Sequence, residues 1–168
     1  MTPVKKWIIT ILSLCCFCGD GFAVGKTMDP PLIQIGGGVF DIIRQDRRHA
    51  QAQIEYKWSP IVYKLRPFIG LMGTGKEAAY VYGGIGLDLF IGKHFVITPS
   101  FAPGIYFQGQ DKNLGYPLEF RSSVEAAAVF SGQYRLGLQF YHISNASLGH
   151  RNPGVECLVL FLAIPLNH

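Results

Sequence analysis

The chain has 168 residues, with 49% hydrophobic residues, 15% charged residues, 20 glycines and a formal net charge of +4. This composition excludes an intrinsically disordered chain, which would be polar and poor in aromatic residues, and the modest charge gives little support to a nucleic-acid partner. Abundant glycine, tyrosine and phenylalanine disfavour a helical bundle, and a mean hydropathy of +0.23 suits a β-barrel with an apolar outer surface and a polar interior.

The N-terminus has the features of a secretory signal. Lys5 and Lys6 precede an apolar run over residues 7–17, and a small-x-small pattern follows at 21–23. We therefore predict a signal peptide over residues 1–23, cleaved after Ala23. An uncleaved anchor is disfavoured because the run is shorter than the ~20 residues that span a bilayer. A lipoprotein signal is the lesser alternative.

Cysteine usage agrees with export. Cys15, Cys16 and Cys18 lie inside the predicted signal, which leaves Cys157 alone in the mature chain, 24–168. No intramolecular disulfide can form there and no metal-ligand spacing is present, so we expect neither a metal nor a cofactor. A closed hydrogen-bonded barrel in a bilayer would supply stability without disulfides.

Alternation of apolar and polar residues predicts eight strands in the mature chain. The clearest runs are 50–58, 84–91, 118–128 and 135–141, with less regular ones at 32–41, 65–73, 95–106 and 155–166. Runs of ~9–12 residues have the length of tilted strands that cross a bilayer. Long loops are expected at 41–49, 73–79, 107–117 and 145–154, and short turns at 59–64, 92–94 and 131–133.

This layout predicts an all-β fold, an eight-stranded antiparallel transmembrane β-barrel in the bacterial outer membrane, with both termini on the periplasmic side. A soluble lipocalin-like barrel or a β-sandwich would also alternate. It is disfavoured because one face carries mid-strand Gln, Glu, Arg and Lys, and a soluble core would not accept unpaired charges.

Three side chains suited to ester hydrolysis fall on the apolar face of the last two strands. His142 and Ser144 are in phase with the apolar residues of 136–140, and Glu156 with those of 158–164. If His142 lies opposite Glu156, the three groups can form one set, because neighbouring strands are ~4.8 Å apart. Serine, imidazole and carboxylate supply the nucleophile, general base and orienting group of acyl transfer. The alternative is polar residues at a barrel rim, where they cost only ~0–1 kcal/mol.

The sequence around these residues resembles a known family. His142-x-Ser144-Asn145-Ala146, followed by Asn152-Pro153-Gly154-x-Glu156, is similar to the C-terminal signature of the lipid A 3-O-deacylase (PagL) family. The resemblance implies an eight-stranded outer-membrane esterase that removes the ester-linked 3-position 3-hydroxyacyl chain of lipid A. It assigns His142 as general base, Ser144 as nucleophile and Glu156 as orienting acid.

The same resemblance bears on residues around this set. It makes Asn145 and Asn152 candidates for oxyanion support or loop ordering, and Ser147 stands where a glycine is expected. The C-terminal Asn167-His168 also departs from the aromatic ending of many outer-membrane barrels.

The predicted partner is lipid A or lipopolysaccharide in the outer membrane, with the site towards the outer leaflet. Arg47, Arg48 and Arg151 lie in the long loops and are candidates for contacts with lipid A phosphates; solvated loop charges are the equal alternative. A homodimer is left open. The rival function is a non-catalytic small barrel that acts as an adhesin, scaffold or lipid sensor.

Overall fold

The computed structural model describes residues 29–44 and 48–166, so the predicted signal peptide lies outside the described residues. The strands are β1 (Leu32–Phe40), β2 (His49–Lys57), β3 (Leu65–Thr74), β4 (Ala79–Leu87), β5 (Leu89–Ile91), β6 (Phe95–Phe107), β7 (Leu118–Val129), β8 (Arg135–Ser144) and β9 (Val155–Pro165). A single 3-10 turn, η1 (Ser131–Gln133), joins β7 to β8. None of the helical structure in these residues is long and apolar enough to cross a membrane.

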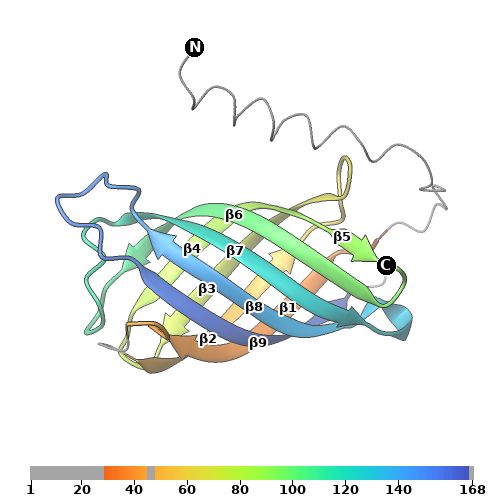
Figure 1. Ribbon diagram of the computed structural model, residues 1–168, viewed down its shortest axis with the longest axis horizontal. Helices are drawn as coiled ribbons and strands as arrows, with labels where there is room; N and C mark the ends of the chain where they lie inside the picture. Colours follow the sequence, from red (N-terminus) through yellow and green to blue (C-terminus); the bar gives the residue numbers. More distant parts are fainter. Residues whose placement is uncertain (1–28, 45–47, 167–168) are drawn as a thin grey trace, which may run out of the picture.

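The strands close into one antiparallel barrel (Figure 1). Neighbouring strands follow the order β4-β3-β2-β1-β9-β8-β7-β6, and β4 pairs with β6 to complete the circle. The short β5 follows β4 after an interruption at Asp88 and also pairs with β6. Counting β4 and β5 as one interrupted strand gives the predicted eight-stranded barrel.

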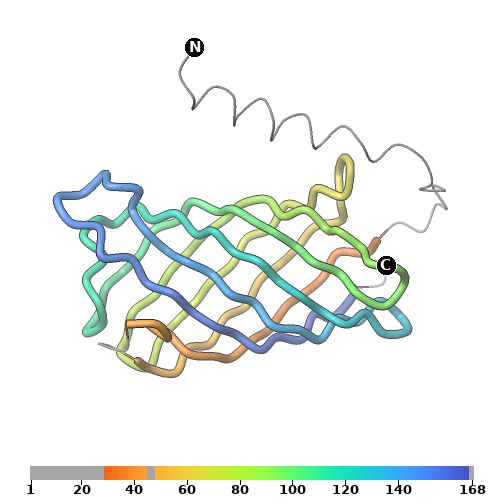
Figure 2. Tube along the Cα trace, in the orientation of Figure 1, coloured from red at the N-terminus to blue at the C-terminus, as the bar shows by residue number. Residues whose placement is uncertain are grey.

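The loops divide between the two ends of the barrel. The β6–β7 and β8–β9 loops project from one end, here called the loop end, while Pro31 and Leu166 meet at the other (Figure 2). The predicted loop over 73–79 is wrong: β4 begins at Ala79, and only a four-residue turn separates it from β3. The turn is tight because Thr74 bonds Ala78 through the backbone and caps two N–H groups with its hydroxyl.

The two faces of the wall differ as the alternation predicted. Inward-facing charges form a buried ion-pair network in the lumen: Lys57–Glu125, Lys57–Glu55, Arg121–Glu55, Arg66–Asp88 and Arg135–Asp88. The outward face is lined by exposed Ile, Leu, Val and Phe side chains. Attraction between the paired charges offsets the desolvation penalty of burying them. The apolar exterior suits a hydrocarbon environment.

Candidate active site

The outward face of the described strands is apolar except at one place. Apart from the aromatic Tyr56, its residues are Gly, Ala, Pro, Val, Leu, Ile or Phe, with four exceptions. The exceptions are Ser122 on β7, His142 and Ser144 on β8, and Glu156 on β9. They lie on three adjacent strands near the loop end, so the serine, histidine and glutamate side chains of this face are gathered in one polar patch.

The His142–Glu156 pair is formed. The two residues are directly opposite each other across β8 and β9, which is the condition on which the predicted set depends. His142 Nδ1 lies 3.0 Å from Glu156 Oε1, with the histidine side chain 43% exposed and the glutamate 16% exposed. A carboxylate at this distance accepts the Nδ1–H, fixes the ring tautomer and leaves Nε2 as the basic nitrogen.

Gly154 forms the floor beneath the imidazole. A Cβ at this position would lie 2.7 Å from His142 Cε1 and 3.3 Å from Nε2. The residue also has a φ of 62°, a left-handed conformation that favours glycine. The ring therefore packs directly on the backbone that leads into β9, with its Nε2 edge on the loop-end side.

Ser144 is the last residue of β8 and pairs with Phe120 of β7. Its hydroxyl makes no hydrogen bond within the described residues. A tight turn follows at once, in which Leu148 N–H donates to Asn145 O at 2.9 Å. Ala146 and Ser147 have φ values of 51° and 65°, a costly pair of conformations for non-glycine residues. Ser147 thus has the left-handed backbone conformation that the glycine expected at this position would adopt easily.

The two asparagines have different surroundings. Asn145 is fully buried, and its Nδ2 donates to Leu114 O and Arg151 O, both at 2.8 Å. Asn152 Oδ1 accepts the Asn145 backbone N–H at 3.1 Å, and the Asn152 amide nitrogen has no partner among the described residues. Both hydrogens of the Asn145 amide are therefore used to order the loop, while the Asn152 amide remains able to donate.

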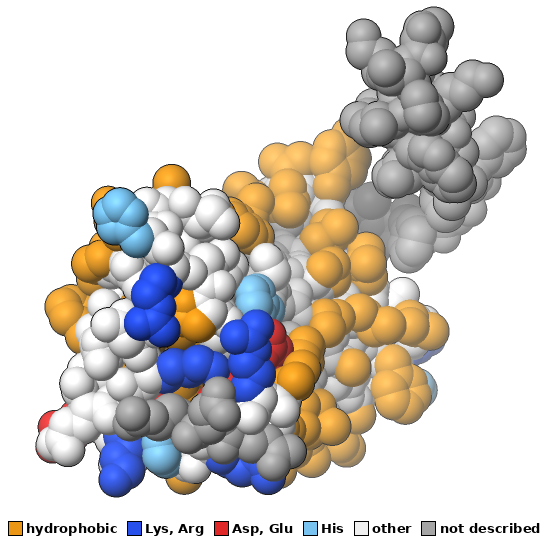
Figure 3. Space-filling view, turned by 60° about the vertical axis from the view of Figure 1, so that its left-hand side comes forward, with side chains coloured by type: hydrophobic (Ala, Val, Ile, Leu, Met, Phe, Trp, Pro, Cys, Tyr) orange, Lys and Arg blue, Asp and Glu red, His pale blue; other side chains and the backbone are white. Residues whose placement is uncertain are grey.

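Basic side chains surround the loop end. Figure 3 shows Lys and Arg gathered on this near end, in front of an apolar wall. Arg48 and Arg151 are exposed there, and Arg48 Nη2 donates to Ile42 O, whose own N–H donates to Glu156 O at 2.9 Å. Ile42 thus links the Arg48 side chain to the backbone of Glu156 through two hydrogen bonds. Arg47 lies outside the described residues.

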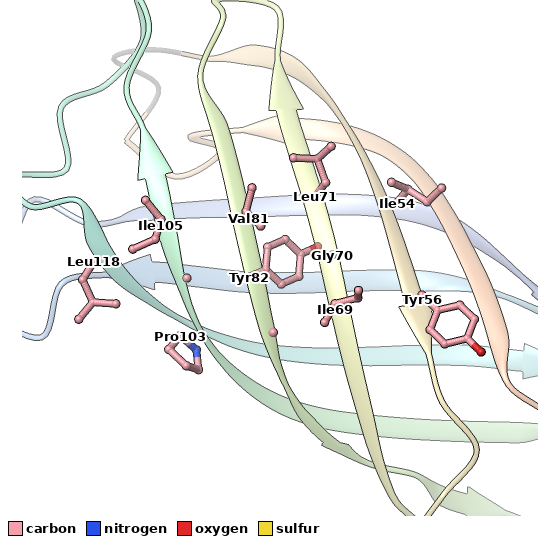
Figure 4. A pocket seen from close by; sticks show the side chains of 12 residues that line it. Ile54, Tyr56, Ile69, Gly70, Leu71, Val81, Tyr82, Pro103, Ile105 and Leu118 are labelled. Carbon is pink, nitrogen blue, oxygen red and sulfur yellow. The ribbon is translucent and has the colours of Figure 1, made fainter.

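A hollow of about 770 Å³ lies on the outer wall of the barrel. Ile54, Ile69, Leu71, Val81 and Ile105 surround it on β2, β3, β4 and β6 (Figure 4). The lining continues over β6 to Leu118 of β7, the strand next to β8. Leu118 is two residues along the same face from Phe120, which is opposite Ser144, so one edge of the hollow lies near the polar patch. It carries apolar side chains and no group suited to hydrolysis.

The sequence prediction missed Ser122 and the role of Gly154. Ser122 alternates in phase with Phe120 and Val124 on the apolar face of β7, and that break in an apolar series was the available signal. The packing of His142 on Gly154 depends on how the ring leans across the strand pair, which has no signature in sequence.

Comparisons with known proteins identify the family of this chain and its fold. Residues 50–165, more than half of the chain, match the family model for lipid A 3-O-deacylase (PagL). The Pseudomonas aeruginosa protein named lipid A deacylase PagL is 38% identical over 56 residues, which are 33% of this chain and 32% of that protein. The aligned part thus spans about a third of the curated relative.

Two solved structures share the fold. The structure described as the crystal structure of the outer membrane enzyme PagL has a TM-score of 0.64 and 20% identity, covering 80% of this chain and 99% of that one. A structure from de novo design of transmembrane β-barrels has a TM-score of 0.59 and 9% identity, covering 84% and 98%. At these identities the likeness concerns the fold alone.

Proposed function

Because this chain belongs to the lipid A 3-O-deacylase (PagL) family, we propose that it is an outer-membrane serine esterase that removes the ester-linked 3-position 3-hydroxyacyl chain of lipid A. The observation that carries the proposal is the His142–Glu156 contact of 3.0 Å on the lipid-facing wall, with Ser144 next along the same face of β8. In this proposal His142, Ser144 and Glu156 are the catalytic residues.

The reaction divides into two steps. His142 Nε2 takes the Ser144 proton as the hydroxyl oxygen attacks the ester carbonyl, and the protonated ring then gives that proton to the departing sugar oxygen. The resulting acyl-enzyme is hydrolysed when Nε2 takes a proton from water, which releases a 3-hydroxy fatty acid and restores Ser144. Glu156 stabilises the imidazolium throughout. The Ser144–His142 hydrogen bond forms with substrate in place, as catalytic hydrogen bonds often tighten in the complex.

The tetrahedral oxyanion needs donors near Ser144. The backbone N–H groups of Ala146 and Ser147 have no partner among the described residues, and neither has the Asn152 amide nitrogen. We assign oxyanion support to these groups and loop ordering to Asn145. Such preorganised donors stabilise charge that develops in the transition state.

An exterior site suits a substrate that is itself a membrane lipid. Lipid A can reach the patch by lateral diffusion with its acyl chains still in hydrocarbon, which avoids ~0.8 kcal/mol for each CH₂ that would otherwise be extracted. In the proposed orientation the loop end faces the outer leaflet. The exposed Arg48 and Arg151 would then meet the phosphates of the lipid.

The test is fatty-acid release from lipid A by the purified, folded protein in detergent micelles. Ser144→Ala should abolish release, and Glu156→Gln should lower kcat by about 10²–10⁴-fold, because the orienting carboxylate is lost while the shape is kept. Ser123→Ala, the same change on the lumenal face of β7, is the matched control and should keep full activity. Unaltered release by Ser144→Ala, or no release by the wild type, would favour the non-catalytic barrel.

A further inference from the structure

Ser122 is the outward polar residue that the proposed reaction does not use. It is exposed on β7 and directly opposite His142. Its neighbours on the same face are Phe120 and Val124 along the strand and Phe101 across on β6. A single hydroxyl is thus set into an apolar surface, beside the imidazole and on the flank away from Glu156.

The Ser122 hydroxyl is unpaired in the part of the chain that the structure describes. Ser122 makes no side-chain hydrogen bond within the described residues, and a polar group left unpaired in hydrocarbon is costly. His142 turns its polar edge towards β9, because Nδ1 binds Glu156 and the Cε1–Nε2 edge packs on Gly154. The β7 flank of the ring is therefore the side on which a bound lipid can meet Ser122.

Distances along the sheet define which substrate group can reach this hydroxyl. Directly opposite residues have Cβ atoms ~4.5–5.5 Å apart, and diagonal neighbours such as Ser122 and Ser144 lie ~7–8 Å apart. A carbonyl carbon attacked by Ser144 is then too far from Ser122 to bond it directly. A polar group on the acyl chain two carbons beyond the carbonyl carbon would lie close enough to Ser122 to form a hydrogen bond.

We propose that the Ser122 hydroxyl binds the 3-hydroxyl group of the acyl chain whose ester is cleaved, and so makes the enzyme selective for 3-hydroxyacyl esters. This inference rests on the proposed function. Ser122 is a substrate-binding residue in it and takes no part in proton transfer.

The experiment compares two lipid A substrates that differ only in whether the 3-position acyl chain carries its 3-hydroxyl. Purified wild type should cleave the hydroxylated ester with the higher kcat/KM. Ser122→Ala should lower that preference by about two- to tenfold, the range of one net hydrogen bond, through slower cleavage of the hydroxylated substrate alone. Ser122→Thr, which keeps a hydroxyl, should retain the preference, and the lumenal Ser123→Ala should match wild type.

Each result is decisive. An unchanged ratio in Ser122→Ala overturns the inference while leaving the esterase function in place, as does an equal loss on both substrates, which would indicate contact with a group common to both. Failure of the wild type to cleave either ester overturns the proposed function and the inference together. A folded barrel is recognised on a gel because heating changes its mobility, and a variant without that change has not folded. If Ser122→Ala does not fold, Ser122→Val replaces it, because valine has the shape of the threonine in Ser122→Thr without its hydroxyl and should lose the preference that Ser122→Thr keeps.

Discussion

The position of the His142 imidazole depends on a residue without a side chain. Gly154 has a left-handed backbone conformation, and the His142 ring packs closely against it. Any side chain there would strain the backbone and push the ring away from Glu156. Because proton transfer falls steeply with misplacement, we expect the identity of residue 154 to affect catalysis more than stability.

We predict that Gly154→Ala lowers kcat at least about tenfold. Gly92→Ala is the matched control, since Gly92 has a φ of 64° but nothing within 4 Å of its Cβ position. Both variants carry similar backbone strain, so both should lose a similar, small free energy of unfolding. Equal kcat values in the two variants, measured by fatty-acid release, would show that the ring does not depend on Gly154.

At the scale of elements, the β8–β9 loop is fastened to the β6–β7 loop. Asn145 links the two through Leu114 O and Arg151 O. Gly115, with a φ of 94°, packs so closely that a Cβ there would lie 2.1 Å from Arg151 O. This contact fixes the turn that follows Ser144, and hence the N–H groups assigned to the oxyanion.

Asn145→Ala should therefore loosen both loops without unfolding the barrel. We expect faster hydrogen exchange over residues 145–154 and 113–117, together with a lower kcat, because two buried hydrogen bonds are lost. Asn113→Ala removes one exposed hydrogen bond to Gly115 N and serves as the control with a smaller effect. Exchange rates that do not change in Asn145→Ala would mean that the loops are held by other contacts.

Alternation predicted most elements because each strand has one apolar and one polar face. It failed at the start of β4, where Tyr80 and Tyr82 face the lumen although they count as apolar residues. Their hydroxyls are hydrogen-bonded there, Tyr82 to Glu55 and Tyr80 to backbone carbonyls. Parity predicted that His142, Ser144 and Glu156 share the outer face, but the pairing of His142 with Glu156 depends on the strand register, which parity alone does not give. The left-handed turn at Ala146 and Ser147 was not predictable either, because it breaks local backbone preferences.

At the scale of the molecule, ion pairs in the lumen connect strands that are distant in sequence. Arg121 and Glu55 are 66 residues apart in sequence, and Lys57 and Glu125 are 68 apart. Parity predicted that these groups share the inner face but could not say which ones pair, because pairing across the lumen depends on the barrel's closure. The network lies on the inner face of the wall, whereas the polar patch of Ser122, His142, Ser144 and Glu156 lies on the outer face. We therefore expect that stability and the proposed chemistry can be altered separately.

Asp88→Asn tests that separation. Asp88 accepts hydrogen bonds from Arg66, Arg135 and Thr98, so loss of its charge leaves two buried guanidinium groups poorly compensated. The free energy of unfolding in urea, followed by Trp58 fluorescence in lipid vesicles, should fall by about 3–5 kcal/mol. Lys64→Ala, at an ion pair in which the lysine is 52% exposed, should cost at most about 1 kcal/mol.

The folded Asp88→Asn protein should keep the kcat of the wild type, since Asp88 lies at the end of the barrel opposite the loop end. A parallel loss of kcat in the folded variant would contradict the separation of the two faces.

If the outward-facing Ser144 attacks an ester of lipid A, lipid A in cells that express the protein must lose one acyl chain. The most direct measurement is the mass spectrum of lipid A extracted from cells that express the wild type or Ser144→Ala, with equal amounts of folded barrel in the membrane. We expect the wild type to lower the mass of lipid A by one 3-hydroxyacyl chain and Ser144→Ala to leave that mass unchanged. The same shift in both strains, or in neither, would contradict this expectation.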